Sequence, residues 1–335
     1  MNLFMPWIER HGLATPWFFV VVFLAASFLM VWRLESMAAG GFEGTVLGTL
    51  VMPYCTGMGN LIFAFVLGRQ GGLGADVLIN CLVNNVTNLT LLIGLPVALW
   101  GMGTAEKVNK KKKKKAPDYT PQLNRLSTLL TLFAVFFFTG TTWALGRRGQ
   151  ISRMDGLVLV GLFLFWQCFH IFEVLKTNVT QNRSLGFMLW VDLFILGVCS
   201  YATYVSTDWL VTWTSTVNSG FISSKYIGWL SGWLDVLPNA LLAFYYAWRR
   251  QPEVVYTSQV GDGHVCIPLC IGVFALYKPI VVPAFFETGV LILGGATIVH
   301  LFCIGLFGRL PRILGWALTA AYLVFLYDGI LKQAG

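Results

Sequence analysis

The chain has 335 residues, of which 56% are hydrophobic, 15% aromatic and only 11% charged. Soluble domains carry about 25% charged residues, so this composition excludes an ordinary soluble enzyme or binding domain and indicates a membrane protein. The net charge of +8 would suit a nucleic-acid partner, but seven of the 23 basic residues lie in one short segment, at Lys107 and from Lys110 to Lys115. We therefore expect no nucleic-acid partner.

The predicted elements are helices that cross a bilayer. A run of about 20 apolar residues is long enough to span the hydrocarbon core. In chain order such runs predict ten spans, near residues 14–34, 43–67, 74–100, 125–146, 155–176, 186–206, 225–247, 260–281, 287–308 and 311–332. The fold class is therefore an all-α polytopic membrane protein, and the lipid bilayer is its first partner.

Basic residues in the loops predict the orientation, because they concentrate on the cytoplasmic side. One side holds the lysine run of loop 101–124, together with Arg33, Arg125, Lys176, Arg183, Arg249, Arg250, Arg309 and Arg312. The other holds Arg10, Arg69, Arg147, Arg148, Arg153, Lys225, Lys278 and Lys332. The first side is heavier, which predicts a multi-pass protein of the cell (inner) membrane with both termini outside.

The lysine run decides that orientation, because the two sides are otherwise equal. Fixing the topology is its simplest role. Anionic lipid at Lys107 and along the run is a further expected partner, since juxtamembrane basic clusters attract such lipids.

A repeat links two distant parts of the chain. The pattern N-x-x-x-A-F begins at Asn60 and again at Asn239, 179 positions later (239 − 60). A polar stretch that ends in glycine follows each copy, at 79–94 and 257–272. The copies begin in spans two and seven, and a shift of five spans inverts one relative to the other. Inverted repeats place a substrate site near the midplane.

The repeat divides the chain into four parts. Residues 1–100 begin the first inverted repeat (spans one to three, motif region 41–100), and 101–124 form the basic cytoplasmic loop. Spans four and five occupy 125–176, and the second repeat occupies 177–335 (spans six to ten, motif region 225–281).

Asparagines form a stripe in the third span. Asn80, Asn84 and Asn88 are spaced i, i+4, i+8 and share a helix face, with Asn85 beside them. We expect this face to point inward, toward the second repeat. Such asparagines either line a polar cavity or make hydrogen bonds between helices.

Several motifs carry a family resemblance. C-T-G-M-G-N (55–60) and L-D-V-L-P-N (234–239) are followed by I-N-C-L-V-N-N-V-T-N (79–88) and T-S-Q-V-G-D-G-H-V-C (257–266), and S-R-M-D-G (152–156) opens span five. This arrangement resembles the calcium/cation antiporter superfamily, the sodium/calcium exchanger family, whose two alpha repeats carry G-T-S-x-P-E and then G-N-x-x-G-S-N-x-x-N.

The resemblance implies a cation site with ligands from both repeats. Carried over one position at a time, the family's ligands fall on Thr56, Asn60, Asn84 and Asn88 in the first repeat, and on Asp235, Asn239, Asp262 and Cys266 in the second. Both glutamates of the family pattern are replaced by asparagine, at positions 60 and 239.

The aligned residues limit the cation. Calcium prefers six to eight oxygens with several carboxylates, and the carboxylates here are Asp235 and Asp262. Such a site suits a monovalent cation or one weakly held divalent ion. Each aspartate costs about 2.5–3.5 kcal/mol at mid-span, so a functional role is the first hypothesis for both. Asp262 could instead lie in a wet, unwound segment between Gly261 and Gly263.

The leading hypothesis is an antiporter-like transporter that exchanges calcium for sodium or protons, as the resemblance implies. Spans two, three, seven and eight would form the core, and spans one and six would slide or rock past it to alternate access. The ion is cargo, Ca²⁺ or Na⁺, and no resident cofactor is expected. The alternative is an exchanger-like subunit that does not transport and serves a structural or regulatory role in a larger membrane complex. No motif of a membrane enzyme is present, so we predict that the protein is not an enzyme.

Overall fold

The computed structural model describes residues 14–39, 54–55, 57–101, 120–178, 187–217, 220–249, 252–261 and 263–331. In the first half these residues form α2 (Ala14–Ala39), α4 (Met58–Arg69), α5 (Gly74–Val86), the π-helix η2 (Thr87–Leu92), α6 (Ile93–Trp100), α7 (Thr120–Gly146), β1 (Gln150–Ile151) and α8 (Arg153–Asn178). In the second half they form α9 (Phe187–Thr216), the 3₁₀ turn η3 (Ser224–Tyr226), α10 (Ile227–Trp248), α11 (Pro252–Gly261), α12 (Gly263–Val265), the π-helix η4 (Cys266–Cys270), α13 (Ile271–Tyr277), β2 (Ile280–Val281), α14 (Phe286–Phe307), α15 (Arg312–Leu326) and the π-helix η5 (Tyr327–Leu331).

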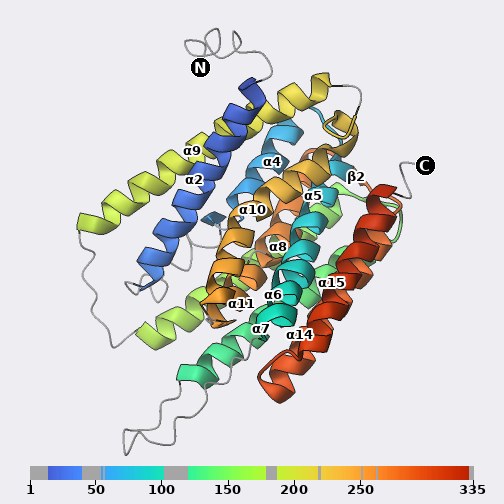
Figure 1. The fold of residues 1–335 in the computed structure, drawn as a ribbon. Coiled ribbons are helices and arrows are strands. Elements are labelled where there is room, and N and C mark those ends of the chain that lie inside the picture. Colours follow the sequence, from blue (N-terminus) through green and yellow to red (C-terminus); the bar gives the residue numbers. More distant parts are fainter. Residues whose placement is uncertain are drawn as a thin grey trace, which may run out of the picture.

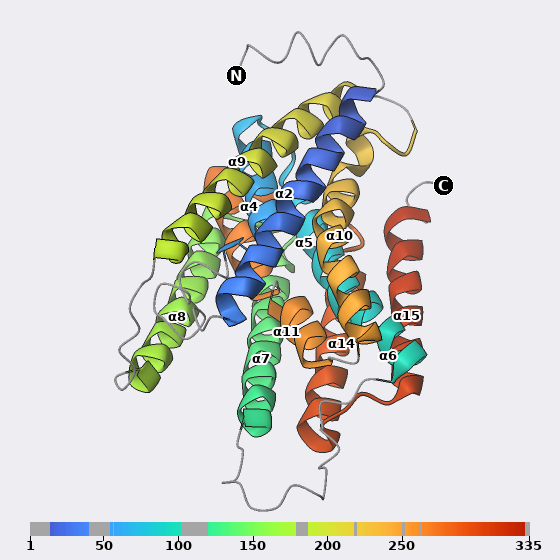
Figure 2. The same cartoon turned by 60° about the vertical axis from the view of Figure 1, so that its left-hand side comes forward.

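The described residues contain nine helical stretches that are long and apolar enough to cross a membrane. The remaining predicted span is represented by α4, a shorter apolar helix, because most of residues 43–57 lie outside the described residues. The start of α2 and the end of α15 lie toward one end of the bundle, and the end of α6 and the start of α7 toward the other (Figures 1 and 2). The protein is therefore an integral, multi-pass helical membrane protein, as predicted.

Two short strands were not predicted. Gln150 pairs with Val281 and Ile151 with Ile280, in antiparallel register. They tie the turn after α7 to the turn after α13. Backbone groups at the end of a span need hydrogen-bond partners, and here the two loops supply them to each other.

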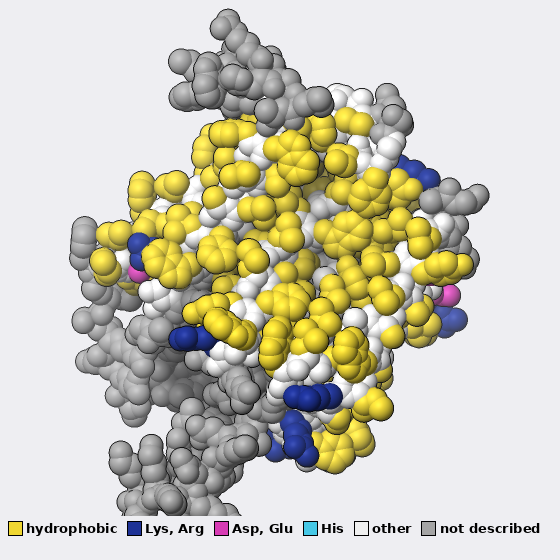
Figure 3. Space-filling model, viewed as in Figure 1, with side chains coloured by type: hydrophobic (Ala, Val, Ile, Leu, Met, Phe, Trp, Pro, Cys, Tyr) yellow, Lys and Arg dark blue, Asp and Glu magenta, His cyan; other side chains and the backbone are white. Residues whose placement is uncertain are grey.

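The outer surface fits a lipid environment. The face in Figure 3 is covered almost continuously by hydrophobic side chains, with scattered charged groups. Exposed apolar residues occur along several spans, for example Phe165, Phe194 and Leu291. A soluble protein rarely exposes so large an apolar surface.

The helix pairing follows the predicted repeat. α2 packs on α9 and α7 on α14, so spans one and six, and four and nine, are partners. α6 packs on α15, and α13 on α8. α6 and α15 are spans three and ten, and α13 and α8 are spans eight and five. A shift of five spans relates span three to span eight and span five to span ten, so these two contacts are equivalent, as two repeats require. The limits predicted for the repeats stay a prediction, because residues 102–119 and 179–186 lie outside the described residues.

Glycines lie at both of these equivalent helix contacts, between α6 and α15 and between α8 and α13. A Cβ atom at Gly94 would lie 2.8 Å from the Gly315 carbonyl oxygen, and one at Gly156 would lie 2.8 Å from that of Gly272. Gly94 and Gly272 are the glycines that end the two polar stretches of the sequence. Small residues allow the backbones of membrane helices to approach closely.

The π-helices recur at equivalent places as well. η2 and η4 start 179 positions apart (266 − 87) and end 178 apart (270 − 92), which matches the repeat shift. Single π turns inside α-helices often lie at functional sites.

The hydrophobic core has separate parts. The main cluster joins residues of most spans, whereas a second cluster consists chiefly of α2 and α9 residues, namely Ala26, Met30, Leu34, Met37, Leu196 and Cys199, with Cys55 from the segment before α4. In both ribbon views α2 and α9 lie side by side along one flank of the bundle (Figures 1 and 2). We refer to these two packed helices as the α2–α9 unit.

Candidate cation site

The asparagine stripe lies in the middle of the span Gly74–Trp100, on α5 and η2. Asn80, Asn84, Asn85 and Asn88 are all buried. Leu82, Val83 and Val86 lie between them, together with Cys81 and Thr87, so the helix is mostly apolar on its other faces. Each of these amides needs partners inside the protein, because the bilayer core offers none.

Asp235 on α10 is the charged group that meets this stripe. The Asn80 side-chain nitrogen donates hydrogen bonds to Asp235 Oδ2 and to Ser231 Oγ, each at 3.0 Å. A Cβ atom at Gly59 would lie 2.2 Å from Asp235 Oδ1, so the carboxylate lies against the start of α4. Asp235 itself is half-buried, whereas the asparagines are buried.

Glycines bring α5 and α10 close enough for these bonds. Gly228 and Gly232 are spaced i, i+4 on α10, a small-xxx-small pattern. A Cβ atom at Gly228 would lie 2.6 Å from the Asp76 carbonyl oxygen, and one at Gly232 would lie 3.0 Å from that of Asn80.

The stripe also touches the second polar stretch, at η4. Asn88 Nδ2 donates to Asn84 Oδ1 at 2.7 Å, and Asn84 Nδ2 lies 3.8 Å from Cys266 Sγ. Cys81 Sγ donates to the Cys266 carbonyl oxygen at 3.3 Å. The asparagine face therefore points inward and meets the second repeat, as predicted.

Three amide oxygens in this region are buried without a donor. The Oδ1 atoms of Asn60, Asn80 and Asn85 have no hydrogen-bond partner among the described residues. A buried acceptor without a partner costs about 1–3 kcal/mol. Neutral amide oxygens beside one carboxylate are the donor set that hard cations such as Ca²⁺ and Na⁺ prefer, so the residues present fit a cation.

The structure brings only some of the predicted ligands together. Asn84 and Asn88 bind each other on the helix face that also carries Asn80, the partner of Asp235, and Asn60 follows Gly59, which lies against Asp235. Asn239 is buried one turn beyond Asp235, and its carbonyl oxygen accepts a hydrogen bond from Gln259 Nε2 at 3.3 Å. Thr56 and Asp262 lie outside the described residues.

Asn80, Ser231 and Asp76 were not predicted as site residues. Asn80 donates to both Asp235 and Ser231, and Asp76 lies one turn before Asn80 on the same face, where its carboxyl group accepts a hydrogen bond from the Gly228 backbone. The i, i+4 spacing of Asp76 and Asn80 was a signal for that face. The contact of Ser231 required the tertiary structure.

Two further polar groups lie outside the asparagine stripe. His300 on α14 is fully buried, with Nε2 2.8 Å from the Leu89 carbonyl oxygen in η2. Asp155 accepts hydrogen bonds from the Ser152 backbone nitrogen at 2.8 Å and from its hydroxyl at 2.7 Å, which makes S-R-M-D a capping box at the start of α8.

A model of the sodium/calcium exchanger protein family matches residues 11–172 and 191–328. The chain belongs to the sodium/calcium exchanger family. Members of this family are transporters, so this exchanger-family chain is not an enzyme. No match to a curated protein was found.

Solved structures show the same fold. The sodium-calcium exchanger NCX_Mj soaked with Na⁺ and Sr²⁺ is 16% identical, with a TM-score of 0.61 over 93% of this chain and 96% of that one. The H⁺/Ca²⁺ exchanger CAX is 17% identical, with a TM-score of 0.66 over 97% of this chain and 86% of that one. The predicted polytopic exchanger fold is thereby confirmed.

Proposed function

We propose that this chain is a cation antiporter that exchanges Ca²⁺ for Na⁺ or H⁺ by alternating access. The observation that carries the proposal is the Asp235 carboxylate held by Asn80 in the middle of the bundle, beside buried amide oxygens that lack donors. NCX_Mj is described as a sodium-calcium exchanger and CAX as an H⁺/Ca²⁺ exchanger, which supports both couples.

The proposed ligands come from both repeats. Asp235 and Asp262 supply the negative charge, while neutral oxygens come from Thr56, Asn60, Asn84, Asn88 and Asn239. Two carboxylates balance one divalent cation, and amides in place of the family's glutamates would weaken its binding. Asp76 lies on the same face, toward the end of the span, and would attract cations to the site.

Flux into proteoliposomes tests the proposal. We expect ⁴⁵Ca²⁺ uptake driven by an outward gradient of Na⁺ or H⁺, and we expect Asp235→Asn to lower the rate at least about tenfold, which corresponds to roughly 1.4 kcal/mol. Asp192→Asn is the control, because Asp192 pairs with Arg33 at 3.4 Å on the flanking helices α9 and α2. An absence of calcium flux under both gradients would reject calcium as the cargo.

The second candidate function is a subunit that no longer transports. The asparagines at positions 60 and 239, where the family pattern has glutamate, favour it. Its apolar outer faces would then contact another membrane protein. Native mass spectrometry of gently solubilised membranes tests this, since a species that contains only this chain would count against a partner complex.

A further inference from the structure

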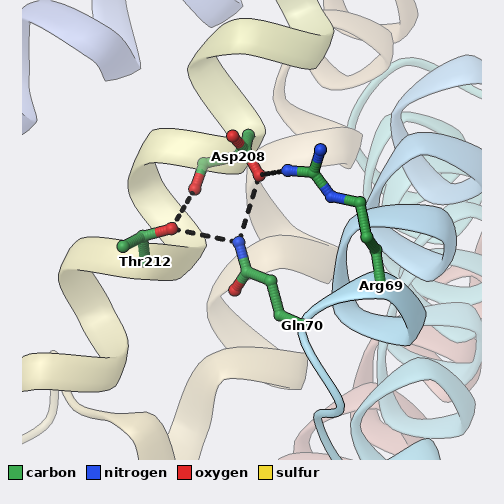
Figure 4. A network of polar contacts seen from close by, with 4 residues as sticks. All are labelled: Arg69, Gln70, Asp208 and Thr212. Atoms are coloured by element: carbon green, nitrogen blue, oxygen red, sulfur yellow. Dashed lines mark hydrogen bonds and ion pairs between the residues drawn. The ribbon is translucent and has the colours of Figure 1, made fainter.

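The helix pair α2–α9 is joined to α4 by a polar network at one end of the bundle. Arg69 and Gln70 end α4, and both donate to the same carboxylate oxygen, Oδ1 of Asp208 on α9, at 2.6 Å and 3.1 Å (Figure 4). Gln70 also donates to Thr212 Oγ1 at 3.0 Å, and the Thr212 hydroxyl donates to the Asp208 carbonyl oxygen at 2.7 Å.

The network is reinforced by an aromatic contact. The Arg69 guanidinium lies 5.9 Å from the ring centre of Tyr204, one turn before Asp208 on α9, and the Phe65 ring lies 6.4 Å from the same ring. Two donors on one carboxylate oxygen and a cation–π contact hold the end of α4 against α9 in one relative position.

A second ion pair on α9 has a different location. Asp192 pairs with Arg33 of α2, at 3.4 Å, inside the α2–α9 unit. The Asp192 and Asp208 side chains have the same exposure, 14%. Movement of the unit as one body would therefore keep the Arg33–Asp192 pair and break the Arg69–Asp208 pair.

We propose that the network of Arg69, Gln70, Asp208 and Thr212 is a latch that holds the α2–α9 unit against α4 in the conformation described here. The inference rests on the proposed alternating-access function, in which this unit moves relative to the rest of the bundle. Release of the latch lets α9 move away from the end of α4, and re-formation of the network restores the present conformation.

Distances between spin labels in lipid nanodiscs test the latch. Phe194→Cys on α9 and Leu291→Cys on α14 carry the two spin labels, because both positions are exposed. The exposed native Cys168 is replaced by serine so that it is not labelled. The unmodified latch should give one dominant distance, and Asp208→Ala should add a second population. Arg69→Ala should add the same population to a smaller extent, because Gln70 still donates to Asp208. The double variant should add no more than Asp208→Ala alone, because Asp208→Ala already breaks the Arg69 contact.

Asp192→Ala is the matched control, since it removes an equally exposed aspartate from the same helix without touching the latch. It should leave the distance distribution unchanged. An unchanged distribution in Asp208→Ala, or the same second population in Asp192→Ala, would overturn the latch. The distance measurement does not depend on ion flux. If calcium flux is observed but Asp208→Ala adds no second distance population, the latch alone is rejected. If the second population appears but no calcium flux is observed, the proposed transport is rejected and the latch stands.

Discussion

Several polar side chains at the centre of the bundle bind groups from the other half of the chain. Asn80 binds Asp235 and Ser231, and Cys81 binds the Cys266 carbonyl. His300 binds the π-helix η2 through the Leu89 carbonyl, and its ring packs edge-on to that of Tyr256, with the centres 5.8 Å apart. These bonds hold the residues of the candidate site at fixed positions.

We predict that His300→Leu destabilises the fold by about 1–3 kcal/mol, because it leaves the Leu89 carbonyl buried without this donor. The thermal unfolding midpoint of the purified protein in detergent measures this. His300→Gln is the control, since its amide nitrogen can donate in place of Nε2 and should recover part of the loss. A leucine variant as stable as the unchanged protein would show that the bond contributes little.

At the level of elements, close packing between α5 and α10 places the asparagine stripe beside Asp235. A Cβ atom at Gly232 would lie 2.8 Å from the Val83 Cβ, so even alanine is crowded there. By contrast, a Cβ atom at Gly294 on α14 meets nothing within 4 Å.

Gly232→Val should therefore separate α5 from α10, with a loss of stability of about 1–3 kcal/mol, as for other overpacked interiors. Gly294→Val is the matched control and should change the unfolding midpoint little. Thermal unfolding and the Asp235-dependent calcium flux measure the two effects. Equal stability of the two valine variants would contradict the close contact.

For the whole molecule, orientation in the membrane depends on the balance of basic residues between its two sides. The described helices place the start of α2 and the end of α15 toward the same end of the bundle (Figure 2). We propose that this end faces outward and that the lysine run, which lies outside the described residues, faces the cytoplasm.

Replacement of Lys110 through Lys115 by glutamine should produce mixed orientations, because the run supplies most of the charge difference between the two sides. Reporter fusions at the C-terminus, one active only outside the membrane and one only inside, measure the ratio. A fully uniform orientation in the glutamine variant would show that other residues set the topology.

The sequence by itself determined the features that depend on local composition and spacing. Hydropathy predicted the spans, and most boundaries lie within a few residues of the helix ends. The end of span six was wrong, because α9 continues ten residues beyond 206 to Thr216, and most of residues 43–57 are not described. The shared helix face of Asn80, Asn84 and Asn88 followed from the 3.6-residue period, and the repeat placed Asp235 opposite them by resemblance.

Only the tertiary structure decided which groups touch across long separations. Asn80 and Asp235 are 155 positions apart, and Arg69 and Asp208 are 139 apart. Local periodicity carries no information on such pairs. Which residues meet depends on which helices pack together and on how closely glycines allow the two helices to approach. The site residues Asn80 and Ser231, the strand pair β1–β2 and the latch on α9 were accordingly found in the fold.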